Sequence, residues 1–429
     1  MAVEERPPRA KAPGRSWRDV LGPGLIAGAS DDDPSGIATY SQAGAQLGFS
    51  ISWTMLLSYP LMVAIQEISA RIGRTTGRGI AANIRRHYPN WMLQVVVALV
   101  LIANTINIGA DIGAMGDAVK ELIGGPQLVY VVAIAVLSAG LQIFISYERY
   151  ARVLRFLTLA LFAYFATLAM VHVRWDEAAR GFFLPTISAD PAFWTTVVAI
   201  LGTTISPYLF FWQASQEVEE VRADPAAQPL VRAPRQAPRA FERIRLDTAI
   251  GMALSNLVAL AIILTTAATL HAHGVTEIET SAQAASALRP LAGEYAFVVF
   301  ALGIVGTGLL AVPVLAGAAA YALAEARQWP EGLARKPAKA RAFYATIAVA
   351  TLVGVLINFS PVSPIRALYW SAVINGVAAV PIMAMMMHMT ANPRVMGKFP
   401  VADGLRIVGW CATAVMAVAV AAMVVGMGR

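Results

Sequence analysis

Long apolar runs alternate with short polar segments along most of the chain. A membrane-crossing helix needs about 20 mostly apolar residues, and several of the runs are longer than that. The pattern therefore predicts an all-α polytopic membrane protein in which about eleven helices cross the bilayer. The approximate limits of these spans are 20–47, 50–72, 91–119, 127–146, 150–173, 192–216, 246–272, 293–324, 341–359, 364–389 and 403–427.

The composition excludes several other classes of protein. Of the 429 residues, 57% are hydrophobic and 14% are charged. A soluble domain has about 25% charged residues, so a soluble enzyme and a disordered protein are poor interpretations. No nucleophile–base pair, HExxH motif or phosphate loop lies in the spans, so we expect no enzymatic activity. The lone cysteine, Cys411, excludes an internal disulfide and a cysteine-based metal cluster.

Lysines and arginines gather in alternate connections. They are frequent before the first span and after the second, fourth, sixth and eighth spans, and scarcer in the other connections. Because positive residues favour the cytoplasmic side, the alternation predicts a cytoplasmic N-terminus and, with eleven spans, an external C-terminus in the inner (plasma) membrane. The net charge of +7 therefore fits the lipid bilayer as a partner, and we expect no nucleic-acid partner.

Two polar segments are predicted to lie on the cytoplasmic side. Residues 1–18 contain no apolar core, so they are expected to form a tail and not a signal peptide. Residues 222–240 are rich in Pro, Ala and Arg, which predicts a flexible linker over about 221–241. Residues 19–429 are expected to form a single transmembrane transporter domain.

Two of the predicted spans are interrupted by a proline among small polar residues. The first contains DDDPSG at 31–36, and the sixth contains TTISP at 203–207. Proline removes a backbone donor and clashes with the preceding turn, so each span is expected to unwind at this point. Two broken helices five spans apart predict a transporter built from inverted repeats, over about 19–174 and 192–390, with an extra helix at about 403–427.

The aspartates of the first break are the strongest candidates for a binding site. A charged aspartate at the centre of the bilayer costs about 2.5 kcal/mol or more, so it needs water, a partner or a cation. Carboxylates together with the free carbonyls of an unwound segment form a ligand set for a hard cation. Asp33 is interpreted as a cation ligand in preference to a helix cap. For Asp31 and Asp32 the two interpretations remain equally open.

Other polar residues in the spans are weaker candidates. Thr203 and Ser206 could offer carbonyls or hydroxyls to an ion, or could bond back to the preceding turn. Asn375 lies midway along its span and is a further candidate ligand. Glu67 and Asp111 could line a pathway or lie at the interface. Asn104, Asn107 and Asn256 are expected only to join helices by hydrogen bonds.

Several motifs resemble those of the Nramp family of divalent-metal transporters. Residues 22–36, followed by Gln42-Ala43-Gly44-Ala45, resemble the first helix of that family, which carries Asp-Pro-Gly-Asn and then Gln-Ala-Gly-Ala. Residues 69–73 resemble the end of its second helix, and residues 202–207 resemble its sixth helix, where the pattern is Met-Pro-His-Asn. The resemblance implies a fold of the LeuT type, with helices one and six unwound.

The resemblance also implies a set of site residues, with marked departures. Asp33 falls on the metal-binding aspartate of the family, and Asp111 falls near an acidic residue used for proton transfer. Gly36 stands where the family has an asparagine ligand, and Ser206 where it has a methionine ligand. Two further positions differ, because Tyr208 and Gln213 stand where the family has histidines.

Together, these features predict a secondary transporter of divalent cations. Because the soft methionine ligand is absent, the site should favour hard ions, namely Mg²⁺ and also Mn²⁺. The cation is then the substrate, and no cofactor is expected. The alternative is a carrier of the same fold for a small anionic or amino-acid solute, since helix N-termini at the breaks attract anions. Weak or absent proton co-transport is expected, and the sequence leaves open whether the protein is a monomer.

Overall fold

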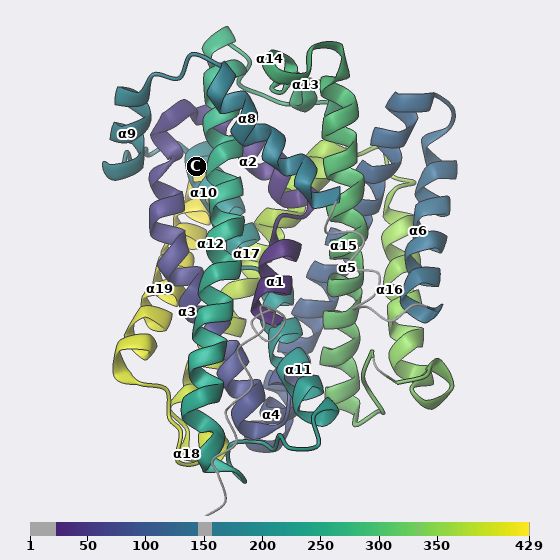
Figure 1. The fold of residues 1–429 in the computed structure, drawn as a ribbon, viewed down its shortest axis with the longest axis vertical. Helices are drawn as coiled ribbons and strands as arrows, with labels where there is room; N and C mark the ends of the chain where they lie inside the picture. The colour runs from purple at the N-terminus through teal and green to yellow at the C-terminus, as the bar shows by residue number, and fades with distance from the viewer. Residues whose placement is uncertain (1–22, 145–156, 334, 429) are drawn as a thin grey trace, which may run out of the picture.

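The computed structural model describes residues 23–144, 157–333 and 335–428, and this part of the chain is helical, with no strand. Most helices run along the long axis of the molecule, and α1 lies at its centre (Figure 1). The α-helices are α1 (Pro23–Asp31), α2 (Pro34–Leu47), α3 (Trp53–Thr76), α4 (Ile80–His87), α5 (Asn90–Ile123), α6 (Gln127–Phe144), α8 (Phe162–Met170), α9 (Trp175–Phe183), α10 (Pro191–Thr204), α11 (Pro207–Ala223), α12 (Ala237–Thr269), α13 (Ser281–Ser286), α14 (Arg289–Ala292), α15 (Ala296–Arg327), α16 (Arg341–Ile357), α17 (Pro364–Thr390), α18 (Pro393–Met396) and α19 (Asp403–Met427).

Every one of the predicted spans contains helix in the described residues. By length and hydropathy, seven helices of the described residues could cross a membrane, or up to eight if a bent pair counts as one span. That pair consists of residues 34–51 and α3, which meet at 110°. The helix over 159–170 and α16 are apolar but shorter. The predicted tail 1–18 and the start of the predicted fifth span lie outside the described residues.

Both predicted helix breaks are present. The first span divides after α1, and α2 begins at Pro34; the sixth divides after α10, and α11 begins at Pro207. Proline suits the first position of a helix because its missing N–H would have no partner there. By contrast, Pro60, Pro313 and Pro381 lie inside the continuous helices α3, α15 and α17. Proline alone therefore does not divide a span in this protein.

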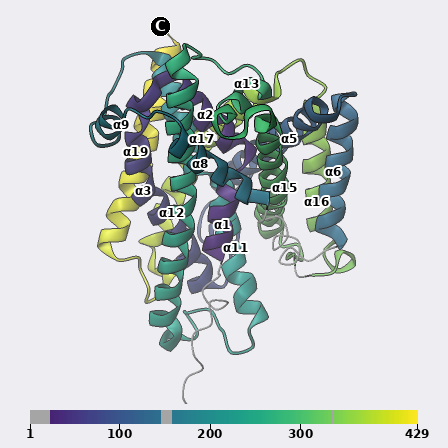
Figure 2. The ribbon, with the colours of Figure 1, turned by 45° about the horizontal axis from the view of Figure 1, so that its top comes forward.

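The broken helices pack closely against two continuous ones. A Cβ added to Gly28 of α1 would lie 2.3 Å from the carbonyl oxygen of Gly251 in α12. A Cβ added to Gly202 of α10 would lie 2.1 Å from the carbonyl oxygen of Ala372 in α17. Glycine at these positions lets the backbones approach, and Figures 1 and 2 both show α1 beside α12. The breaks are thus held in the middle of the bundle.

The connection between α11 and α12 is shorter than the linker predicted over 221–241, because helix extends into both of its ends. It also follows the end of α3. The amides of Leu230 and Val231 donate to the carbonyls of Arg74 and Thr75, at 3.3 and 3.2 Å. The Arg74 guanidinium donates to the Gln236 side chain at 2.9 Å, and Leu230 is fully buried. These contacts give the segment a defined path in the structure.

Candidate functional site

Asp33 lies between the two half-helices of the first span and is buried. Its Oδ1 accepts the N–H of Gly36 at 2.7 Å, which caps the N-terminus of α2. Its Oδ2 accepts a hydrogen bond from the Asn107 side chain at 3.0 Å. One oxygen therefore serves as a helix cap, while the other faces α5. The cap interpretation and the site interpretation apply to different atoms of the same carboxylate.

Asn107 connects Asp33 to a third helix. While its Nδ2 donates to Asp33, its Oδ1 accepts the hydroxyl of Ser371 in α17 at 2.7 Å. The sequence suggested only that Asn107 joins helices, and its contact with Asp33 was missed. A helical spacing of four residues was the available signal: it places Asn107 on the same face as Asp111, and Ser371 on the same face as Asn375.

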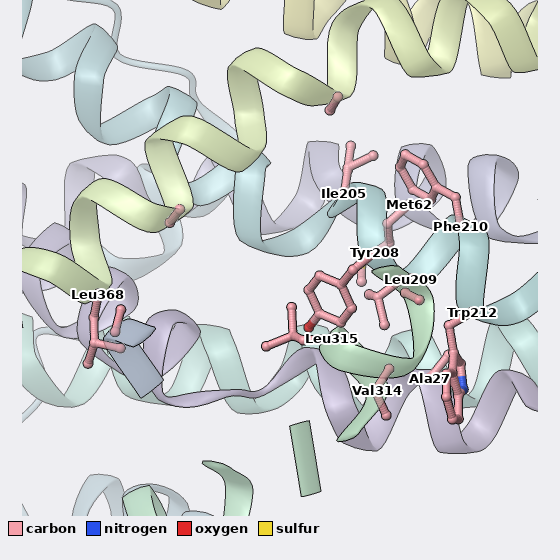
Figure 3. Close-up of a cluster of buried hydrophobic side chains, with 14 of the residues drawn as sticks. Ala27, Met62, Ile205, Tyr208, Leu209, Phe210, Trp212, Val314, Leu315 and Leu368 are labelled. Carbon is pink, nitrogen blue, oxygen red and sulfur yellow. The ribbon is translucent and has the colours of Figure 1, made fainter. Parts of the chain in front are cut away.

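Tyr208 brings the second broken helix to the first. Its hydroxyl donates to the carbonyl of Ser30 at 2.9 Å and lies 3.5 Å from Oδ2 of Asp33. The ring lies in an apolar cluster with Ile205, Leu209 and Leu315 (Figure 3). Tyr208 therefore lies where the sequence predicted a site residue, and its polar end reaches the first break.

Asp31 and Asp32 face a different helix from Asp33. Both carboxylates lie within hydrogen-bonding distance of the Ser255 hydroxyl in α12, which is 2.6 Å from Asp31 Oδ2 and 3.1 Å from Asp32 Oδ1. A hydroxyl has one proton and can donate to only one of them at a time. Ser255 is a second residue that sequence reasoning missed, since it is one of many small polar residues in the spans.

The two breaks abut at Gly36 and Thr203. A Cβ added to Gly36 would lie 3.1 Å from the Thr203 hydroxyl and 3.3 Å from the carbonyl oxygen of Asp31. This tight space matters because Gly36 stands where an asparagine ligand was expected by resemblance. Ser206 bonds back to its own helix: its hydroxyl donates to the carbonyls of Gly202 and Thr203, at 2.6 and 2.9 Å.

Three further predicted residues are buried and lack hydrogen-bond partners among the described residues. Both side-chain oxygens of Asp111 are unpartnered, as are both polar atoms of Asn375 and Gln213. They come from α5, α17 and α11 respectively. Buried polar groups are almost always satisfied, so these atoms call for water or an ion. Together with the contacts of Asp33, they make the middle of the bundle a polar region.

Glu67 has a different environment. It pairs with Arg71 one turn further along α3, with an N–O distance of 2.5 Å. The Arg71 guanidinium also lies over the ring of Phe241, 4.5 Å from its centre. The predicted pathway residue is thus neutralised by its own helix. The adjacent Gln66, which the sequence analysis did not single out, is buried without a partner for either polar atom among the described residues.

A cavity of about 590 Å³ lies along α2. Its wall includes Ala38, which lies about one turn beyond Asp33, and the acidic residues Glu277 and Glu279. The segment that carries these glutamates is attached to α2 through Gln42, whose side chain donates to the carbonyl of Thr276 at 3.1 Å and accepts the amide of Ile278 at 2.8 Å. Arg366 also lines this cavity and pairs with Glu279, with an N–O distance of 2.9 Å, so the wall carries charges of both signs.

The donors gathered around the breaks are oxygen atoms of carboxylates, hydroxyls, amides and carbonyls. Among the described residues, no group of three or more His, Cys, Asp or Glu side chains could hold a metal ion. An ion bound beside Asp33 would therefore have few charged ligands and would retain part of its water shell. Such a wet oxygen site suits hard cations.

Long apolar helices, two of them broken beside a buried polar site, define a multi-pass secondary transporter and not an enzyme. A family model described as natural resistance-associated macrophage protein-like matches residues 24–426. The chain belongs to this family, Nramp.

Individual relatives agree with this assignment. The "Divalent metal cation transporter MntH" of Klebsiella pneumoniae (strain 342) is 26% identical over 413 residues, which cover 92% of this chain and 91% of MntH. The structure of the Eremococcus coleocola manganese transporter is 15% identical, with a TM-score of 0.74 and coverage of 97% of this chain and 90% of that chain. MhsT in complex with L-phenylalanine is 12% identical, with a TM-score of 0.64 and coverage of 96% and 100%. The two structural likenesses show the shared LeuT-type fold.

Proposed function

We propose that this protein carries divalent cations across the plasma membrane and favours the hard ions Mg²⁺ and Mn²⁺. The observation that carries the proposal is the Asp33 carboxylate, which is buried where the two broken helices meet and turns its Oδ2 toward Asn107 and Tyr208. A buried carboxylate with no basic partner requires a compensating charge during transport. The relatives named for divalent cation and manganese transport support the same class of substrate.

The preference for hard ions rests on the absence of a soft ligand. The position implied for a methionine is Ser206, and its hydroxyl is bonded to backbone carbonyls of its own helix. A thioether favours transition metals, whereas carboxylate, carbonyl and water suit Mg²⁺ and Mn²⁺. Mg²⁺ loses its water reluctantly and is usually held by one or two carboxylates, which fits a site with Asp33 as its main charged ligand.

A carrier of small anionic or amino-acid solutes is the second candidate. The similarity of fold to MhsT, whose structure holds L-phenylalanine, favours it. Three consecutive aspartates at the first break count against it, because they would repel an anion. Orientation forms part of the first proposal: the arginine-rich connections support a cytoplasmic N-terminus and, with eleven spans, an external C-terminus.

Direct binding tests the proposal. Purified protein is titrated calorimetrically with Mg²⁺, Mn²⁺ and Cd²⁺, and Asp33→Ala is compared with Asp117→Ala. Asp117 lies on α5 and accepts a hydrogen bond from Ser281, away from the breaks. We expect saturable Mg²⁺ and Mn²⁺ binding in the wild type and in Asp117→Ala, and none in Asp33→Ala. Tight Cd²⁺ binding without a response to Mg²⁺ would refute the hard-ion preference, and no divalent binding at all would favour the solute carrier.

A further inference from the structure

A second polar cavity lies far from the helix breaks, at the end of the molecule where α4 packs between α11 and α15 (Figure 1). Its volume is about 370 Å³. Side chains from these three helices and from the segments beside them form its walls. The lining residues are Arg78, Ala82, Arg85, Arg86, Arg222, Ala324, Glu325, Gln328, Trp329 and Glu331.

The two carboxylates of this cavity are already engaged. Glu325 accepts the backbone N–H of Ala82 at 3.0 Å and the hydroxyl of Ser215 at 3.1 Å. Glu331 pairs with Arg222, with an N–O distance of 3.2 Å. The lining has four arginines and two glutamates, so two positive charges remain in excess even when both carboxylates are counted.

Three guanidinium groups consequently have no acidic partner among the described residues: those of Arg78, Arg85 and Arg86. Burial and the neighbouring charges of Arg86 and Arg85 lower the pKa of Arg78 from its ordinary value. Burial and the charges of Arg86 and Arg78 likewise lower the pKa of His87, at the end of α4. Burial is the largest cause of both pKa shifts, and the neighbouring arginine charges act in the same direction.

We propose that this cavity binds a phosphate-bearing anion, held by Arg78, Arg85 and Arg86 with Trp329 at its rim. A guanidinium presents a planar fork of donors that matches phosphate oxygens, and paired forks bind phosphate strongly. The cavity is large enough for more than one phosphate group. A bound anion would relieve the repulsion among the arginines. The source of the phosphate is either a soluble anion or an anionic lipid headgroup.

The proposed anion site and the transport site lie at opposite ends of α11. Helix α11 begins at the second break and ends beside the cavity with Arg222. Arg222 is already paired with Glu331, so the anion is held by α4 and the segment before it. The proposal concerns anion binding alone, so it holds or fails independently of which substrate is carried.

Sodium pyrophosphate is the probe for the test. Detergent-purified protein is titrated while its melting temperature is followed, with sodium chloride of equal ionic strength as the salt control. The variants are Arg85→Gln with Arg86→Gln, and separately Arg78→Gln. The matched control is Arg239→Gln, an exposed arginine of α12 that does not line the cavity. We expect saturable stabilisation of the wild type and of Arg239→Gln, with the apparent Kd raised about tenfold or more for each arginine removed.

The source of the phosphate is resolved by repeating the titration in nanodiscs of phosphatidylcholine alone and of phosphatidylcholine with phosphatidylglycerol. Equal affinity in both points to a soluble anion, whereas weaker pyrophosphate binding in the anionic discs identifies the lipid headgroup as its competitor. The proposal is overturned if pyrophosphate gives no more stabilisation than sodium chloride. It is also overturned if Arg78→Gln and the double variant bind it as well as Arg239→Gln does.

Discussion

At the scale of single residues, Asp33 has a structural task and a chemical one, and the two can be separated by substitution. Asn is as good a helix cap as Asp but has no charge. The free energy of unfolding of Asp33→Asn should therefore lie within about 1 kcal/mol of the wild-type value. Asp33→Ala also loses the helix cap, which contributes about 1 kcal/mol. Both variants should lose cation uptake. Melting curves and uptake into proteoliposomes check this, and transport by Asp33→Asn at the wild-type rate would contradict it.

Asn107 is expected to position the Asp33 carboxylate. Loss of a side chain that holds a metal ligand typically lowers affinity about 10–100-fold, so Asn107→Ala should weaken Mg²⁺ binding by about tenfold. Asn104→Ala on the same helix is the control, because its amide donates to the carbonyl of Leu315 and does not contact Asp33. Calorimetric titration of both variants distinguishes them. Equal affinities for the two variants would show that Asn107 has no positioning role.

Ser206 tests the origin of selectivity. Ser206→Met introduces a thioether at the second break and should raise the affinity for Cd²⁺ relative to Mg²⁺, on the order of tenfold. Ser206→Ala serves as the control, since it also removes the back-bonded hydroxyl but adds no soft ligand. Competition between the two ions in a binding assay gives the ratio. If the ratio is the same in both variants, side chains at this position do not reach the ion.

The sequence could identify which residue types mattered, but it could not show which way they face. It predicted Asp33 as a site residue because it precedes a proline in a span, and Tyr208 as a pathway residue because it stands where the family has a histidine; the structure places the two side chains together. It did not connect Asn107 or Ser255 to the aspartates, because those contacts depend on how helices far apart in the chain are rotated against each other. The roles of Ser206, Thr203 and Asn375 in ion binding remain predictions.

At the scale of elements, the two breaks were predictable because each proline follows a residue of a type that favours the start of a new helix. Asp33 and Ser206 precede the prolines at the breaks and adopt extended backbone conformations. The tight contacts of the broken helices were not predictable, since many glycines occur in the spans. The linker over 221–241 was predicted from composition, which contains no information on its backbone hydrogen bonds to the end of α3.

The contact of α1 with α12 makes a prediction about stability. Because a Cβ on Gly28 would lie 2.3 Å from the backbone of Gly251, Gly28→Ala should destabilise the protein by about 1–3 kcal/mol through overpacking. Gly140→Ala on α6 is the matched control, as nothing lies within 4 Å of an added Cβ there. Replacing glycine by alanine inside a helix should by itself raise the free energy of unfolding by about 0.5–1 kcal/mol. Denaturation midpoints measure both, and equal shifts would show that α1 is not closely packed.

At the scale of the whole molecule, composition and span length were enough to predict a multi-pass helical protein. The count was harder, because bent and short helices do not satisfy a simple length rule. Seven helices, or up to eight, meet that rule in the described residues, although helix is found in all of the predicted spans. The angle at which α2 meets α3 depends on tertiary packing and has no signature in the run of apolar residues.

Energy coupling also belongs to the whole molecule. No histidine lies in the broken helices, and Gln213 stands where a histidine was implied by resemblance, so cation uptake should proceed with little or no proton movement. A pH-sensitive dye inside proteoliposomes measures this during Mg²⁺ uptake. Asp111→Asn is the informative variant, because Asp111 is buried and falls, by resemblance, near an acidic residue used for proton transfer. Internal acidification that follows uptake in the wild type and disappears in Asp111→Asn would refute the prediction.

The hydrogen bond from Asn107 to Asp33 has a consequence for the transport cycle. An arriving ion must displace the Asn107 amide from the Asp33 carboxylate. The net affinity for the ion is therefore the free energy of ion binding less that of the lost hydrogen bond, and this difference makes release easier. After release, the amide again shields this carboxylate. The amide donates a hydrogen bond but no positive charge, so it eases ion release without replacing the compensating charge that the buried carboxylate requires during transport.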